Sequence, residues 1–246
     1  MNITVLGCFG PYPPAGGACS GYLLEHEGSY ILLECGNGVL SKLQYYINTD
    51  KLEAVFISHL HSDHISDLFI MRYALQIDRE QGKRKTPLSI FAPAAPAEEL
   101  ERLPYKDLYT IETIDEGKTV SVASLSFSFL KTLHPIECYA MRVQERGGKS
   151  FVFSGDTAYF TALIPFVQGT DLFLCEANYL QGDLEYGAPH NHLTASQAGQ
   201  IALQADVRKL LLTHLPPHRN SSTYLAEALT IFPDAALAKE GTTFTI

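Results

Sequence analysis

An apolar run at Ala54–Ile57 leads into the stretch Ser58-His59-Leu60-His61-Ser62-Asp63-His64, which holds four potential metal ligands within six positions. His59 and His61 are two residues apart, so an extended backbone points both rings the same way. The turn into a following helix then brings Asp63 and His64 to the same place. Imidazole and carboxylate groups suit Zn²⁺ and some iron or manganese sites. This stretch therefore predicts a metal site.

Three more ligand types each stand at the end of an apolar run further along the chain. They are His134 after Phe127–Leu133, Asp156 after Phe151–Gly155 and His214 after Leu210–Thr213. Sites of α/β folds lie at the carboxyl ends of strands. A single histidine in such a place is usually an ordinary loop residue, but with the first stretch the set reaches five imidazoles and two carboxylates. Such a set suits two metals that share one carboxylate and a water.

Short β-rich runs alternate with amphipathic helical stretches, which is typical of an α/β domain with helices packed outside its sheets. We expect strands at Ile3–Gly7, Tyr22–His26, Tyr30–Glu34, Ala54–Ser58, Leu88–Ala92, Leu125–Leu133, Ala140–Gln144, Ser150–Ser154, Leu172–Glu176 and Lys209–Thr213. We expect helices near Gly38–Ile47, His64–Arg79, Ala97–Leu103, Thr194–Ala205 and Thr223–Phe232. Thr194 is placed to cap the fourth of these helices.

The chain has 246 residues, of which 46% are hydrophobic and 18% charged. This composition excludes a disordered chain, and the length predicts one domain over residues 1–246. No apolar run approaches the roughly 18 residues of a membrane helix, and the first residues do not form a signal peptide. Five scattered cysteines without a Cys-x-x-Cys motif favour a cytoplasmic protein. The net charge of −9 disfavours an extended RNA-binding groove.

The ligand pattern, in its order along nearly the whole chain, resembles that of the metallo-β-lactamase superfamily. The resemblance implies a four-layer αβ/βα sandwich with two divalent metal ions at the edge between its sheets. The ions implied are Zn²⁺, with Mn²⁺ and Fe²⁺ as alternatives. Carried over by position, the first ion is held by His59, His61 and His134, the second by Asp63, His64 and His214, and Asp156 bridges them.

Within the superfamily, the ribonuclease Z branch is the most similar. Cys19–Leu24 is similar to the opening of that branch, and Ile31–Gly38 resembles its next motif, with Glu34 in place of Asp. Leu172–Tyr179 resembles its His-Glu-Ala-Thr-Phe motif, with Cys175 and Asn178 as departures, and His192–Ala198 resembles its His-Ser-Thr-Ala motif. The resemblance implies that Glu176 orients His192, which acts on the leaving group. It also gives Asp63 a catalytic role, as hydrogen-bond acceptor for a metal-bridging hydroxide.

One difference from ribonuclease Z bears on the substrate. That branch inserts a long flexible arm, which grips transfer RNA, between the third histidine and the bridging aspartate. Here only 22 positions separate His134 from Asp156, enough for a strand hairpin. The resemblance therefore implies a phosphodiesterase without the arm, which cleaves small or cyclic phosphodiesters or nucleic-acid ends. It also implies a homodimer.

Two alternatives to a phosphodiesterase stay open from the sequence. A lactonase or thioesterase would use the same metals, although it has no evident need for Glu176 and His192. An iron-dependent oxidoreductase of this fold is the alternative of another class, although flavodiiron proteins carry Glu where this chain has His61. The roles of His190, His218 and Arg219 also stay open, and Arg219 is a candidate for binding substrate phosphate.

Overall fold

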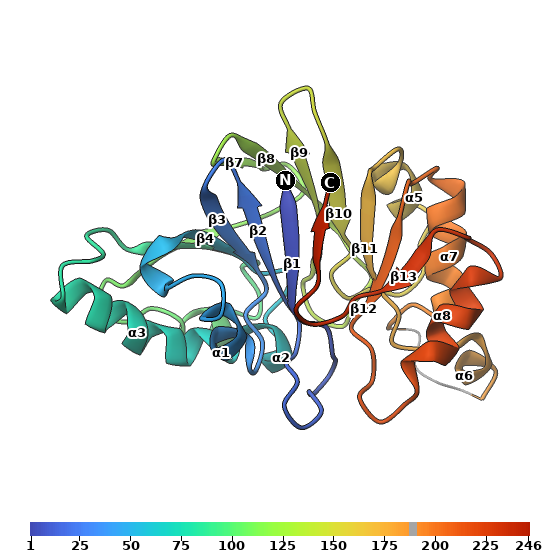
Figure 1. The fold of residues 1–246 in the computed structure, drawn as a ribbon, viewed down its shortest axis with the longest axis horizontal. Helices are drawn as coiled ribbons and strands as arrows, with labels where there is room; N and C mark the ends of the chain where they lie inside the picture. The colour runs from blue at the N-terminus through green and yellow to red at the C-terminus, as the bar shows by residue number, and fades with distance from the viewer. Residues whose placement is uncertain (187–190) are drawn as a thin grey trace.

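Two seven-stranded sheets face each other in the computed structural model, which describes residues 1–186 and 191–246 (Figure 1). In spatial order, the first sheet holds β14 (Thr243–Thr245), β1 (Asn2–Gly7), β2 (Gly21–His26), β3 (Ser29–Leu33), β4 (Leu52–Phe56), β5 (Leu88–Ala92) and β6 (Tyr109–Thr113). The second holds β13 (Ala235–Leu237), β12 (Leu210–Thr213), β11 (Leu172–Glu176), β10 (Ser150–Phe153), β9 (Tyr139–Glu145), β8 (Leu125–Lys131) and β7 (Thr119–Val122).

Helices cover the outer face of each sheet, as Figure 1 shows at its two sides. Beside the first sheet lie α1 (Val39–Leu43), α2 (Ser62–Ile65), α3 (Leu68–Glu80), α4 (Ala97–Leu100) and a 3₁₀ turn at Thr49–Lys51. Beside the second lie α5 (Leu163–Val167), α6 (Gln181–Glu185), α7 (Ala195–Gln204) and α8 (Ser221–Leu229). Among the described residues, no helix is long and apolar enough to cross a membrane.

Three apolar clusters hold these layers together. The largest lies between the sheets, where Phe56 of β4 stacks on Phe127 of β8 with ring centroids 3.9 Å apart. The other two lie between each sheet and its own helices, around Met71 of α3 and Ile201 of α7. The order helix, sheet, sheet, helix confirms the predicted four-layer αβ/βα sandwich.

The predicted helix over His64–Arg79 was wrong in one respect, since α2 ends at Ile65 and α3 begins at Leu68. Asp67 lies in the break, where its backbone N–H donates to Cys35 O at 3.0 Å and its carboxylate accepts from the backbone of Leu40 at 2.9 Å. These bonds tie the break to the segment after β3. At α7, by contrast, Thr194 caps the helix as predicted, because its hydroxyl accepts from the backbone N–H of Gln197.

Parallel strands determine where a site can form. In the first sheet β3, β4, β5 and β6 run parallel, and in the second sheet β10, β11, β12 and β13 do. The residues that follow β3, β4, β10, β11 and β12 meet at one edge, between the two sheets. Sites of α/β folds form at such carboxyl ends, and this edge is where the predicted ligands gather.

Candidate metal centre

Three histidines from two sheets converge on one point. The ring nitrogen Nδ1 of His61 lies 2.9 Å from Nε2 of His59 and 3.1 Å from Nε2 of His134. The ligand atoms of a tetrahedral zinc ion lie roughly 3.3 Å apart when each Zn–N distance is about 2.0–2.1 Å. The three nitrogens are therefore close enough together to hold a single ion, and they are the group that the family resemblance implies for the first ion.

A second group lies beside the first. Oδ2 of Asp63 is 3.2 Å from Nε2 of His214 and 3.6 Å from Nε2 of His64. His64 lies in α2, shortly after β4, and His214 follows the end of β12, so segments that follow strands of both sheets again contribute together. These ligand atoms all lie within 4.8 Å of one another, which satisfies the geometric requirement for a second ion.

Asp156 lies between the two groups. Its Oδ2 is 3.6 Å from Nε2 of His59 on one side, and 3.6 Å and 3.5 Å from Nε2 of His64 and His214 on the other. The side chain is buried, and Gly155 before it has a positive φ of 58°, which a glycine adopts without strain. Asp156 thus lies within reach of both groups.

The rings are held through their second nitrogens. Nδ1 of His59 lies 3.0 Å from the hydroxyl of Ser58, and Nδ1 of His134 lies 3.2 Å from the carbonyl of Asn191. Nδ1 of His64 hydrogen-bonds to the carboxylate of Glu34. Metal-binding histidines characteristically use the far nitrogen in this way, because the bond fixes the tautomer and the ring.

Glu34 was missed as a site residue, although its motif was recognised from the sequence. It follows β3, is fully buried, and its Oε1 accepts the backbone N–H of Ser58 at 2.6 Å. The signal was a charged residue at the end of an apolar strand, Ile31–Leu33, since a carboxylate is almost never fully buried without a partner. Its histidine partner lies 30 positions away, which no local pattern indicates.

Two buried atoms test whether these residues fit metal ions. Nε2 of His64 and Oδ1 of Asp156 have no hydrogen-bond partner in the described part of the chain. Burial and the neighbouring imidazolium of His64 lower the pKa of His59 well below its usual range, and burial lowers the pKa of His134 to about 4. Both rings therefore stay neutral near pH 7, the form in which imidazole binds a metal.

The charge around His64 points the same way. Burial opposes the imidazolium, but Asp156, Asp63 and Glu34 together raise the pKa of His64 well above its usual range. Burial likewise opposes the carboxylate of Asp156, but the facing imidazoles, with His214 foremost, lower its pKa well below normal. Three carboxylates around one ring favour positive charge at this place, and divalent ions would supply it.

A separate pair flanks the metal ligands. Oε1 of Glu176, at the end of β11, lies 2.9 Å from Nδ1 of His192 and accepts the backbone N–H of Thr157 at 2.7 Å. Glu176 is fully buried, and the side chain of His192 is 14% exposed. Burial opposes a charged His192, but Glu176 outweighs it and raises the pKa of His192 to about 9. The predicted pairing of Glu176 with His192 is therefore present in the structure.

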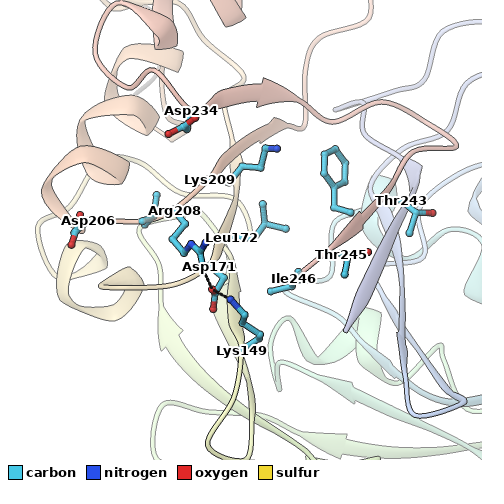
Figure 2. Close-up of a pocket in the computed structure, with 12 residues that line it drawn as sticks. Lys149, Asp171, Leu172, Asp206, Arg208, Lys209, Asp234, Thr243, Thr245 and Ile246 are labelled. Atoms are coloured by element: carbon cyan, nitrogen blue, oxygen red, sulfur yellow. Dashed lines mark hydrogen bonds and ion pairs between the residues drawn. The ribbon is translucent and has the colours of Figure 1, made fainter.

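A cavity of about 320 Å³ opens over these groups. Its lining comprises Pro11, His61, Ser62, Asp63, His134, Asp156, Asn191, His192 and His214. Its described lining includes no lysine or arginine. A larger hollow of about 800 Å³ lies elsewhere, where Lys149 and Arg208 pair with Asp171 (Figure 2). The described lining of that hollow includes no histidine, whereas four histidines line the smaller cavity.

Of the three residues left open from the sequence, Arg219 has a structural partner. Its guanidinium lies 2.5 Å from Oδ2 of Asp183 and 3.2 Å from the hydroxyl of Tyr224, and it does not line the cavity. Its candidacy for binding substrate phosphate is therefore not supported. His218 is exposed and also does not line the cavity, and His190 lies outside the described residues.

Residues 29–215 match the family model described as the Beta-lactamase superfamily domain, and the chain therefore belongs to this superfamily. It is similar to the probable metallo-hydrolase YhfI of Bacillus subtilis, with 36% identity over 242 residues that cover 98% of both chains. The crystal structure of YhfI superposes with a TM-score of 0.94, over 99% of this chain and 98% of that one. These relationships place the chain among the metallo-hydrolases, whose family implies divalent metal ions.

More distant relatives widen the comparison. Ribonuclease Z of Clostridium tetani is 27% identical over 306 residues, covering 98% of this chain and 96% of that protein. A diphosphatase of the PhnP family shares the fold, with 16% identity, a TM-score of 0.79 and coverage of 100% of this chain and 97% of that one. The ribonuclease Z match is 60 residues longer than this chain, so the relative contains segments that this chain lacks.

Proposed function

We propose that the protein is a phosphodiesterase that uses two divalent ions, in the first place zinc, to cleave small or cyclic phosphodiesters. The observation that carries the proposal is the Glu176–His192 pair, which lies beside the metal ligands without belonging to them. Hydrolysis of a phosphodiester with a poor leaving group requires a proton for the departing oxygen. A lactonase or thioesterase has no evident use for a second, separately held imidazolium.

The seven predicted ligands would hold the ions. His59, His61 and His134 form one group, Asp63, His64 and His214 form the other, and Asp156 contacts both. Two divalent ions, when bound, lower the pKa of a water towards about 7 and neutralise charge on phosphoryl oxygens.

The chain's own residues supply the remaining functions. Glu176 keeps His192 charged at neutral pH and fixes its Nδ1, so the opposite nitrogen is free to protonate the leaving oxygen. A positioned acid of this kind accelerates a reaction by roughly 10²–10⁴-fold. Asp63 offers a carboxylate oxygen beside His214 and His64, from which it can orient the attacking water by a hydrogen bond.

The size and charge of the cavity support a small substrate. A volume of about 320 Å³ is at the lower end of small-molecule sites. Binding of a long RNA depends on many phosphate contacts from lysine and arginine, and the described lining contains neither. Between His134 and Asp156 the chain forms only β9, β10 and a tight turn, where the resemblance to ribonuclease Z would require an arm.

A substrate panel tests the proposal. We expect zinc-loaded protein to hydrolyse a chromogenic phosphodiester faster than a lactone, a thioester or intact precursor transfer RNA at equal enzyme concentration. Faster turnover of the lactone or thioester would favour the other hydrolase class, and efficient release of a transfer-RNA trailer would overturn the assignment to small substrates. An anaerobic metal analysis with an absorbance scan separates the iron-dependent alternative.

A further inference from the structure

The backbone of His214 is held in an unfavourable conformation. Its φ is 55°, in the left-handed region that non-glycine residues seldom adopt. Apart from Glu34, the other described non-glycine residues with positive φ lie in turns. Such a conformation persists at a functional site only where the surroundings enforce it. The contacts of His214 with its neighbours must therefore hold its backbone in this conformation.

One amide contacts both the backbone and the ring of His214. Nδ2 of Asn178 donates to the carbonyl of His214 at 2.9 Å and to the carbonyl of Gly10 at 3.4 Å. The same nitrogen is 3.4 Å from Nδ1 of the His214 ring. Asn178 is only 9% exposed, so water competes little for these bonds.

The backbone of Asn178 is anchored as well. Its N–H donates to Oε2 of Glu176 at 3.3 Å, and its carbonyl accepts from the hydroxyl of Tyr224 at 3.3 Å. Asn178 lies two residues after the end of β11, so its position depends on the same strand that places Glu176. The residue thus lies between the metal ligands and the Glu176–His192 pair.

Gly10 also packs against the ring of His214. A Cβ at Gly10 would lie 2.0 Å from Nε2 of His214, so the backbone there packs directly on the imidazole. Two bonds between main chains keep this segment in place: Leu215 N–H to Cys8 O at 3.0 Å, and Gly10 N–H to Leu215 O at 3.2 Å. The amide of Asn178 joins the two segments, because it binds a carbonyl from each.

We propose that Asn178 is a positioning residue that sets the backbone and ring of His214, and through them one of the two metal positions. The inference rests on the proposed function, because it takes His214 as a ligand. Asn178 is also a departure from the ribonuclease Z motif, which has Thr at this place. An amide supplies two N–H donors where a hydroxyl supplies one, and here two carbonyls need a donor.

Zinc titration against a chromophoric chelator tests the effect on the metal. Asn178→Leu keeps the branched shape but has no hydrogen-bond donor. Asn178→Ala removes both the shape and the donors, and Asn178→Thr keeps one donor. We expect the Leu and Ala variants to bind one zinc as the wild type does and the second about 10–100-fold more weakly, the usual cost of removing a partner of a ligand. The Thr variant should recover part of that loss. Asn220→Ala, which removes an asparagine that caps α8, is the matched control and should change neither affinity.

Hydrogen exchange of the metal-free protein tests the same inference without metal or activity. The amides of Leu215 and Gly10 should exchange on the order of tenfold faster in Asn178→Ala than in the wild type, because the link between their segments opens locally. Unchanged exchange together with zinc affinities within about twofold would overturn the role of Asn178. A wild type that binds no second zinc would instead overturn the proposed metal site, while the exchange result would still decide whether Asn178 holds His214.

Discussion

In each sheet, a fully buried glutamate stands at or just after the end of one strand. Each of these glutamates hydrogen-bonds to Nδ1 of a histidine. Glu34 follows β3 and holds His64, whereas Glu176 closes β11 and holds His192. Oε1 of each glutamate accepts one backbone N–H, from Ser58 and from Thr157 respectively, and Oε2 of Glu176 accepts a second from Asn178. Each half of the sandwich therefore contains a buried glutamate–histidine pair.

What differs is the surroundings of each ring. His64 is fully buried, and its Nε2 lies 3.6 Å from carboxylate oxygens of both Asp63 and Asp156. His192 is partly exposed and lines the cavity. A buried Glu–His pair is thus not specific for one chemistry. The groups around the far nitrogen decide whether the ring suits a metal or a proton.

The largest expected effect comes from removing Asp156, the carboxylate that lies between the two groups of candidate ligands. Asp156→Ala should lower zinc affinity by more than about 100-fold, because loss of a shared ligand must exceed the 10–100-fold cost of losing an outer partner. Elemental analysis of protein purified without chelator measures it, with two ions per chain expected in the wild type. His218→Ala, an exposed histidine outside the cavity, is the control. Equal metal content in the two variants would remove Asp156 from the centre.

The next effect concerns His192, the proposed proton donor. His192→Ala should keep both metals and lower kcat on a phosphodiester by about 10²–10⁴-fold, with a small change in KM if the residue acts in the transition state. The loss should shrink for a substrate with a very acidic leaving group, which needs no proton. Steady-state kinetics with two leaving groups measure this. Activity within a few fold of the wild type on both would show that His192 is an ordinary loop residue.

The same substitution, glutamate to glutamine, made at Glu34 and at Glu176 compares the two glutamate–histidine pairs directly. Glu34→Gln should weaken zinc binding by about 10–100-fold, since it removes the charged partner of a ligand. Glu176→Gln should leave zinc binding unchanged and reduce kcat, though less than His192→Ala does, because an amide still accepts a hydrogen bond. Metal titration and kinetics on both variants give a two-by-two test. Identical effects on zinc binding and kcat in the two variants would contradict the separate roles of Glu34 in metal binding and Glu176 in proton donation.

The smallest effect is a shift of the pH profile. His192 must be protonated to act, so kcat should fall as pH rises through its pKa. Glu176 raises that pKa to about 9 against the effect of burial, and nearby metal cations would lower it from this value. Glu176→Gln removes the negative neighbour and should move the alkaline limb to lower pH by about 1–3 pH units. A limb that stays in place would show that another group titrates.

The sequence predicted the central strands because they are continuous apolar runs covered on both faces. It missed β6, β7 and β14, in which threonine, serine or glutamate interrupts the apolar residues, and β13, which has only three residues. The short helices α5 and α6 were also missed, since five residues show little periodicity. Tertiary contacts, and not local preference, decide these elements.

The candidate ligands could be picked out from the sequence because they stand at or just after the ends of apolar strands. The groups that hold their rings were not, as Glu34, Asn178 and the carbonyl of Asn191 show. These partners are separated from the rings they touch by 30, 36 and 57 positions, and one of them is a backbone atom that no side-chain pattern reveals. Such contacts arise only once both sheets are assembled.

The pairing of β1 with β14 places Asn2 opposite Thr245, so β1 gains this neighbour only after the more than 200 residues between the two strands have been made. Figure 1 shows the two ends of the chain side by side for this reason. During synthesis at about 5–20 residues per second, β1 waits roughly 12–50 s for this neighbour. Throughout that interval the nascent sheet presents an unpaired edge. β14 therefore covers the open side of β1 late in synthesis, and it becomes the edge strand in place of β1.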